Sequence, residues 1–373
     1  MKPQSSADLA RTRRSVASWL GVLFVLVFVL NLAGGWVRLS GAGVAIPHWP
    51  LIDIGGKRTL LPPFTKPGWD AVHAAYLDHQ AKLYERIEKG ELTRANLGRI
   101  PTSRDEFRGM FLTEWTHRLL AAVVGVLAAA CLTTVLRRAE LRHSVGVPFS
   151  AACGLIVMQA VIGGMLVEQG TNTRWLFLHQ GNAGLIMGCL LWSMLRLLNP
   201  IGVLSVPRRP WLVAGLAVAL VWTWSQLLSG ALVSSSRHLV PSDLSVPLFA
   251  QTWVNEAGLA WNLLQNPRLH QWAHRWSAWT LVGVLVVVYG FARFSACGER
   301  LRLALQVSAT FVGVQIVLGL ASAMVGTHPL LALAHQAMGM ALLLSLVLAF
   351  HDARHEEEML MIDDQAGNPA VAG

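Results

Sequence analysis

The sequence predicts an all-α integral membrane protein whose eight transmembrane helices form two four-helix bundles related by a pseudo-twofold axis. Three observations predict this fold class. Of the 373 residues, 54% are hydrophobic and only 14% are charged, whereas soluble domains carry about 25% charged residues. The apolar residues form long runs, and motifs in the first half of the chain recur in the second half.

Eight apolar runs are long enough to cross a bilayer, which requires about 20 mostly apolar residues. A basic segment, residues 1–17, precedes the first run, and no small-residue cleavage site follows a short apolar core, so this run is expected to remain as a span. The predicted spans are Ser18–Val37, Trp115–Leu136, Val147–Val167, Leu176–Leu197, Trp211–Val233, Gln271–Phe291, Leu303–Val325 and Leu330–Phe350.

Arginines cluster in the loops between spans two and three, four and five, and six and seven. By the positive-inside rule, these loops and both termini are expected on the cytoplasmic side. The first outer loop, residues 39–113, is basic but too long for the rule to count it. Within that loop, Trp69–Lys89 has apolar residues three and four positions apart. A surface helix is expected there, as either an interfacial helix or a solvated connector.

Three motifs repeat at a nearly constant offset, with His274 following His117 by 157 residues and His335 following His179 by 156. Because each half has an even number of spans, both halves have the same orientation, and the axis relating them runs along the membrane normal. The matched motifs are Glu114-Trp115-Thr116-His117-Arg118 with Gln271-Trp272-Ala273-His274-Arg275, Gln159–Gly163 with Gln315–Gly319, and His179-Gln180 with His335-Gln336. The predicted domains are bundles 18–197 and 211–350, a linker 198–210 and a tail 351–373.

Four histidines, His117, His179, His274 and His335, lie in the first turns of spans that begin at the outer face. Ionisable groups inside spans are costly, so they face the bundle interior and mark function. Two imidazoles at one depth in each bundle suit axial ligation of an iron porphyrin. A lone buried histidine is more often a hydrogen-bonded core residue, but four at matched positions favour bis-histidine haem ligation. Nearby glycines would permit close approach: Gly163, Gly164, Gly184, Gly319 and Gly339.

Other metal sites, disulfides and nucleic acid are not expected. No acid or cysteine accompanies the histidines in both halves, as a zinc or copper site would require. Three of the four cysteines lie in predicted spans and Cys297 in an inner loop, without CxxC spacing. The net charge of +9 comes largely from arginines at span ends, so a nucleic acid partner is not expected. The remaining nine histidines are interpreted as ordinary solvated residues.

The repeat breaks where Glu114 stands three residues before His117, because its counterpart before His274 is Gln271. A spacing of three places Glu114 on the same helix face as His117, one turn further out. A carboxylate beside a porphyrin can accept protons, orient water or stabilise a developing cation. The N-terminal bundle, which also has the long outer loop, is therefore predicted to do the chemistry, and the C-terminal bundle to hold an electron-transfer haem. An interfacial acid solvated at the start of the span is the alternative for Glu114.

Arginines directly follow two of the histidines. Arg118 and Arg275 have the guanidinium shape that pairs well with haem propionates. Snorkelling toward the lipid headgroups is an equally good interpretation.

Several motifs together resemble the haem A synthase family over nearly the whole chain. They are Gly35-Trp36-Val37-Arg38-Leu39-Ser40-Gly41-Ala42-Gly43, Trp49-Pro50-Leu51, Leu61-Pro62-Pro63, Glu106-Phe107, Glu114-Trp115-Thr116-His117-Arg118-Leu119, and the later His179-Gln180 and His335-Gln336 pairs. Some members of that family carry a cysteine pair in the outer loops. This chain has none there, so a thiol or disulfide step at the outer face is not expected.

The resemblance implies a multi-pass enzyme of the bacterial inner membrane that oxidises the C8 methyl group of haem O to the formyl group of haem A for terminal oxidases. It further implies that His274 and His335 ligate haem b, with its iron, while His117, His179 and Glu114 belong to the substrate side. The implied partners are haem O as substrate, haem O synthase, oxidase assembly factors and membrane lipid.

Two other function classes suit the same pattern. A dihaem b-type electron carrier would have two equivalent haem sites and no need for Glu114. A transporter would also suit internal repeats, although transporters usually have broken helices near the bilayer midplane.

Overall fold

The computed structural model of the chain describes residues 6–92, 97–199, 209–235, 252–295, 297–325 and 328–356. Within those ranges, eight helices are long and apolar enough to cross a membrane, which confirms the predicted all-α membrane fold. Each predicted span lies inside one of them. They are α1 (Ser6–Leu39), α3 (Arg104–Arg137), α4 (Ala139–Glu168), α5 (Thr173–Leu198), α6 (Pro210–Ser235), α9 (Pro267–Arg293), α10 (Glu299–Val325) and α11 (Pro329–Arg354).

The helices extend past the predicted spans because polar residues cap their ends. Helix α3 begins eleven residues before Trp115, where the Ser103 side chain accepts a hydrogen bond from the Glu106 N–H. Helix α9 begins after Asn266, whose side chain accepts from two backbone N–H groups of the first turn. Such caps satisfy the N–H groups that lack partners at a helix start.

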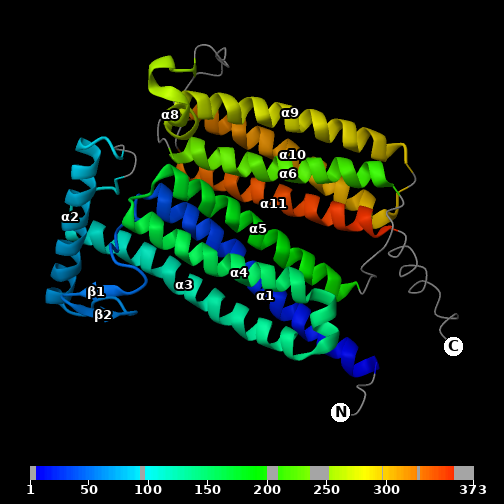
Figure 1. Cartoon of the computed structure of the whole chain (residues 1–373), viewed down its shortest axis with the longest axis horizontal. Helices are drawn as coiled ribbons and strands as arrows, with labels where there is room; N and C mark the ends of the chain where they lie inside the picture. Colours follow the sequence, from blue (N-terminus) through cyan, green and yellow to red (C-terminus); the bar gives the residue numbers. More distant parts are fainter. Residues whose placement is uncertain are drawn as a thin grey trace.

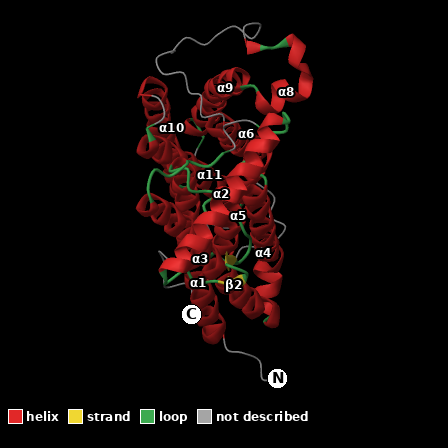
Figure 2. Cartoon of the chain, turned by 90° about the vertical axis from the view of Figure 1, so that its left-hand side faces the viewer, coloured by secondary structure: helices red, strands yellow, loops and turns green. Residues whose placement is uncertain are grey.

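Helices α1, α3, α4 and α5 pack against one another, and α6, α9, α10 and α11 form a second group. In Figure 2, which looks down the helices, the two groups lie side by side. The groups meet where α5 contacts α6 and α11, and where α1 contacts α11. Helix pairs that correspond in the sequence repeat make corresponding contacts, with one exception: α3 packs along α4, whereas α9 barely contacts α10. The pseudo-twofold axis stays a prediction.

The start of α1 and the end of α11 lie at the same end of the molecule, at the right of Figure 1. The opposite end carries α2 (Lys66–Glu88), the short strands β1 (Ile52–Ile54) and β2 (Lys57–Thr59), and α8 (Gly258–Gln265). This arrangement is the one that an even number of crossings requires. The predicted linker falls mostly on residues 200–208 and the predicted tail mostly on 357–373, which lie outside the described residues.

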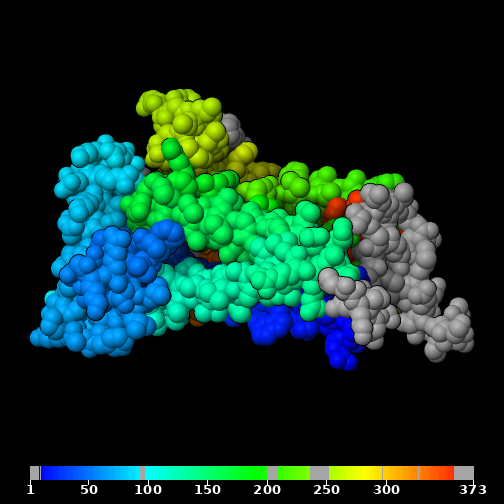
Figure 3. All heavy atoms as spheres, turned by 60° about the horizontal axis from the view of Figure 1, so that its bottom comes forward, coloured from blue at the N-terminus to red at the C-terminus, as the bar shows by residue number. Residues whose placement is uncertain are grey.

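The predicted outer loop folds into a cap over the end of the first bundle that lies opposite the termini. Strands β1 and β2 pair antiparallel, and α2 confirms the helix predicted at Trp69–Lys89. One face of α2 is buried through Val72, Tyr76, Gln80 and Leu83. Val72 and Tyr76 join an apolar cluster with Phe107 of α3, so α2 is a packed part of the cap and not a free connector. Figure 2 shows α2 lying across the ends of the bundle, and Figure 3 shows the cap covering one end of α3.

Candidate functional site

Each of the four predicted histidines lies against a glycine of a neighbouring helix. A Cβ atom added to the glycine would lie 3.1 Å from Cε1 of His117 for Gly34, 3.6 Å from that of His179 for Gly163, 3.3 Å from that of His274 for Gly230, and 3.2 Å from that of His335 for Gly319. Contacts at 3.1–3.3 Å are tighter than an ordinary Cβ contact, so those three rings use the space that the missing side chain leaves. This tight contact therefore occurs once in the first bundle, at His117, and twice in the second, at His274 and His335.

The structure brings the histidines together in two pairs, as the repeat predicts. His117 on α3 is close enough to His179 on α5 to interact electrostatically, and His274 on α9 interacts likewise with His335 on α11. Three of the four have a buried Nδ1 atom with no hydrogen-bond partner among the described residues, namely His117, His179 and His335. A buried polar atom left unpaired costs about 1–3 kcal/mol. Each of these three rings therefore has a nitrogen that a ligand could satisfy.

The His274 and His335 pair has the spacing of two ligands on one metal. The ring centroids are 6.4 Å apart, with 77° between the ring planes. A metal bound by two imidazoles, with each nitrogen at about 2 Å, separates the ring centroids by about 6 Å. Nδ1 of His274 contacts Ser229 Oγ at 2.8 Å and Gln226 Nε2 at 3.0 Å, which fixes the ring and leaves Nε2 for a ligand. The residues therefore fit a bis-histidine haem.

A haem iron needs only two protein ligands, because the porphyrin supplies four nitrogen ligands. Within the described part of the chain, no three or more His, Cys, Asp or Glu residues are grouped to hold a metal ion. Within the described residues no cysteine forms a disulfide: Cys131, Cys153 and Cys189 lie in spanning helices, and Cys297 lies between α9 and α10.

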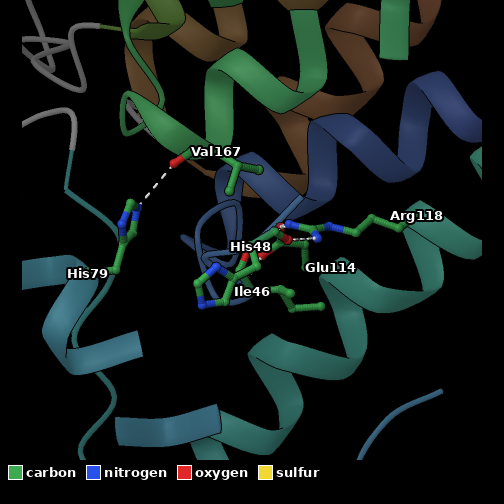
Figure 4. A network of polar contacts seen from close by, with 6 residues as sticks. All are labelled: Ile46, His48, His79, Glu114, Arg118 and Val167. Atoms are coloured by element: carbon green, nitrogen blue, oxygen red, sulfur yellow. Dashed lines mark hydrogen bonds and ion pairs between the residues drawn. The ribbon is translucent and has the colours of Figure 1, made fainter. Parts of the chain in front are cut away.

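Glu114 and Arg118 form a buried ion pair on α3 (Figure 4). The Glu114 side chain is 3% exposed, and its Oε1 accepts from Arg118 Nη2 at 2.6 Å and Nε at 3.1 Å. Its other oxygen, Oε2, accepts from the Ile46 N–H at 2.8 Å. Arg118 also donates to the carbonyl oxygens of Ile46 at 2.6 Å and His48 at 2.5 Å. The pair thus ties residues 46–48 of the cap to α3, one turn outward of His117.

This network excludes the alternative given for Glu114, and it shows which groups accept hydrogen bonds from Arg118. Glu114 is not a solvated interfacial acid, because the cap buries it. The donors of Arg118 go to Glu114 and the cap, while its pairing with a haem propionate stays a prediction. Arg275 lies half-buried on α9 beside His274, and its propionate role also stays a prediction.

The cap reaches the first-half site through Trp49. The Trp49 ring lies against Gly164 of α4, where a Cβ atom would come within 2.9 Å of the ring. Gly164 is adjacent to Gly163, which faces His179. A second attachment joins His79 Nε2 of α2 to the Val167 carbonyl oxygen at 3.1 Å (Figure 4). The first site therefore has a protein wall on its outer side.

The other predicted glycines also mark close approaches. Gly184 of α5 faces Trp224 and Leu343, and Gly339 of α11 faces Leu227 and Gln315. Both predicted contacts are confirmed as helix-packing contacts, with distances of 3.0–3.3 Å to an added Cβ atom.

Sequence reasoning missed several residues of this region. Gly34 and Gly230 escaped it because the histidines that they face are distant in sequence. Ser229 and Gln226 have no counterpart in the first half that would have signalled them. The interpretation of the other histidines as solvated is wrong for His270, His351 and His355, which are all less than 5% exposed, because each packs at a helix end inside the fold.

Comparison with known proteins places the chain in a family. The family model described as cytochrome oxidase assembly protein matches residues 17–347. A protein of Rhizobium etli named heme A synthase is 27% identical over 332 residues, covering 84% of this chain and 82% of the relative. A heme A synthase of Nitrosospira multiformis is 27% identical over 343 residues, covering 86% and 88%.

These matches bear on the predicted class of protein. Synthases are enzymes, so the prediction of a membrane enzyme is confirmed. Because the family model covers most of the chain, the resemblance seen in the motifs is confirmed as well. This eight-helix membrane protein belongs to the cytochrome oxidase assembly protein family.

Proposed function

We propose that the chain is a haem A synthase, which oxidises the C8 methyl group of haem O to a formyl group and so gives haem A for terminal cytochrome oxidases. One observation carries the proposal. The two histidine pairs are of similar construction, but the first lies under a folded cap with a buried Glu114–Arg118 pair, whereas the second has Gln271 at the position of Glu114. Two like sites with unlike surroundings suit an enzyme in which one haem is cofactor and the other is substrate.

The second site suits the resident cofactor. His274 and His335 would ligate haem b, and Arg275, which follows His274, would meet a propionate. When bound there, haem b supplies electrons one at a time. Ser229 and Gln226 hold the His274 ring by Nδ1, which would leave Nε2 to bind the iron. Gly230 and Gly319 leave room for the rings.

The first site suits the substrate. His117 and His179 would bind haem O, with Gly34 and Gly163 leaving room for their rings. Glu114 and Arg118 hold the cap segment 46–48 and thereby Trp49 over this site. That wall excludes water from the reacting methyl group, which protects a reactive site from side reactions. Glu114 is also the nearest carboxylate for proton transfer, although it must first give up hydrogen bonds to serve as an acid or base.

The proposal includes the location and the orientation of the protein in the membrane. We place the protein in the bacterial inner membrane with both termini in the cytoplasm, so that both histidine sites lie near the outer face. Membrane lipid surrounds the bundle, and haem O synthase and oxidase assembly factors are the proposed protein partners.

Pigment analysis tests the function. The protein is purified from membranes of a host that makes haem O, and its haems are extracted and separated. Haem b together with haem O or haem A is the expected result. Haem b alone would favour a dihaem electron carrier, and the absence of haem would favour a transporter. A His117→Ala variant, which removes a ligand from the substrate site only, should retain haem b and lose the second pigment.

A further inference from the structure

Two adjacent glycines of α1 separate the two histidine sites. Gly34 lies against His117 of the first site, as described above. Gly35 lies against α11, where an added Cβ atom would come within 2.6 Å of Gln336 Oε1 and 3.0 Å of Leu333 Cδ1. At this point α1 has no side chain on either side. The ring of His117 and the side chain of Gln336 therefore each lie against the backbone of α1, at adjacent residues.

Gln336 is the residue next to His335, the predicted haem b ligand, and it is hydrogen-bonded to α1. Its Nε2 donates to Asn31 Oδ1 at 3.1 Å and to the Asn31 carbonyl oxygen at 3.3 Å. Asn31 lies one turn inward of Gly35, inside a spanning helix. Polar side chains within a span are costly, so a bond between two such amides across the bundle interface is a specific contact and not a surface accident.

The second half of the chain lacks this contact on its own equivalent helix. Gly230 of α6 faces His274 as Gly34 of α1 faces His117. Counted from that glycine, the position of Gly35 is Ala231 and the position of Asn31 is Leu227. A leucine side chain, unlike that of asparagine, cannot accept a hydrogen bond from an amide. Because the contact joins α11, which carries His335, to α1, which packs against His117, it links the two histidine sites at one place.

We propose that the Gly34–Gly35 pair and the Gln336–Asn31 hydrogen bond couple the two histidine sites, with Gln336 and Asn31 as positioning residues for electron transfer. The inference rests on the proposed function. A haem b held by His274 and His335 would supply one electron, and haem O held by His117 and His179 would accept it. No bond forms and no proton moves. The amide pair sets the separation and orientation of the two sites.

An exchange of the two amides tests the pair. Gln336→Asn shortens one side chain by a methylene group, and Asn31→Gln lengthens the other by the same amount. Each single variant breaks the hydrogen bond or strains it, whereas the double variant restores the combined reach. Gln306→Asn makes the same chemical change at an exposed position of α10 and serves as the matched control.

The measurement uses the purified protein with its haems. Haem b is photoreduced with a ruthenium dye, and its re-oxidation is followed by absorbance with and without haem O. We expect each single variant to keep haem b and its low-spin spectrum but to slow the re-oxidation that depends on haem O by about tenfold. The double variant should recover most of the wild-type rate, and Gln306→Asn should match the wild type.

Two results would overturn the inference: single variants that transfer electrons at the wild-type rate, or a double variant no faster than the slower single one. Should Gln336→Asn lose haem b because it adjoins His335, Asn31→Gln carries the test, since Asn31 lies on a helix with no haem ligand. A wild-type protein that contains haem b but makes no haem A would contradict the proposed function instead.

Discussion

Glu114 and Arg118, one helical turn apart on α3, close on each other inside the protein, with Oε1 of Glu114 2.6 Å from Nη2 of Arg118. The second carboxylate oxygen and the remaining guanidinium donors are taken up by the backbone of residues 46–48. A carboxylate that accepts these three hydrogen bonds is a fixed part of the wall. Removal of one partner from such a buried pair costs about 3–5 kcal/mol.

Glu114→Gln should impair turnover more than folding. The second half carries Gln271 at the matching position, so the bundle accepts an amide there. A glutamine has one accepting oxygen in place of two, so either Arg118 or the Ile46 N–H loses its acceptor and the cap loosens. We expect normal insertion and haem b content, with haem A production reduced by at least about 10²-fold. Separation of extracted haems measures this, with exposed Glu140→Gln as control. Haem A at the wild-type rate would show that the carboxylate is dispensable.

Alanine at His274 or His335 should abolish the low-spin haem b spectrum, because one axial ligand is lost. The matched substitutions His117→Ala and His179→Ala should leave that spectrum in place and remove the bound substrate. Absorbance spectra of the purified variants distinguish the two sites. A wild-type haem b spectrum in either second-half variant would contradict the assignment.

Gly319→Ala should weaken haem b binding without replacing any ligand. The added Cβ atom would lie 3.2 Å from Cε1 of His335 and displace the ring. Gly313→Ala, on the same helix, is the matched control, since nothing lies within 4 Å of its added Cβ atom. We expect the haem b content of Gly319→Ala to fall several-fold while that of Gly313→Ala is unchanged. Equal haem b content in both variants would mean that the close contact is immaterial.

The docking of the cap should depend on pH through His79. Burial lowers the pKa of His79 below its ordinary 6.5, with His48 and Lys82 lowering it further and Asp78 and the Val167 carbonyl opposing them. The folded cap thus holds a neutral ring, whose contribution is complete above pH 6.5 and is lost as the pH falls toward the lower folded-state pKa. Hydrogen exchange of α2, corrected for its intrinsic pH dependence, should show weaker protection at acid pH. His79→Gln should remove that dependence, and an unchanged dependence would assign it to another group.

Reporter fusions test the orientation. Fusions after Arg138 and at the C-terminal Gly373 should report a cytoplasmic location, and a fusion after Asp78 in α2 should report the outer side. The arginine clusters at one end of the bundle are the physical reason. A reporter at Gly373 on the outer side, together with a cytoplasmic one after Arg138, would require an odd number of crossings between these two positions.

The eight spans, the surface helix and the four histidines could be predicted from the sequence alone. Apolar runs and the 3.6-residue period are properties of consecutive residues, so they can be seen without knowledge of the fold. The repeat added the pairing of the histidines, because motifs such as Gln159–Gly163 and Gln315–Gly319 match along the chain. His117, His179, His274 and His335 were found in this way, and the structure brings them together in the expected pairs.

The surroundings of those histidines could not be predicted, because they depend on how the helices pack. Gly34 faces His117 across 83 positions of sequence, and Gln336 bonds to Asn31 across 305. Such contacts depend on which helices adjoin, and a glycine that makes room for a ring leaves no local pattern. The ion pair and burial of Glu114 could not be predicted, because the segment that buries it, residues 46–48, is not helical and has no periodicity. Burial and hydrogen bonding of polar groups are decided by the neighbours that folding supplies, and these lie far away in the chain.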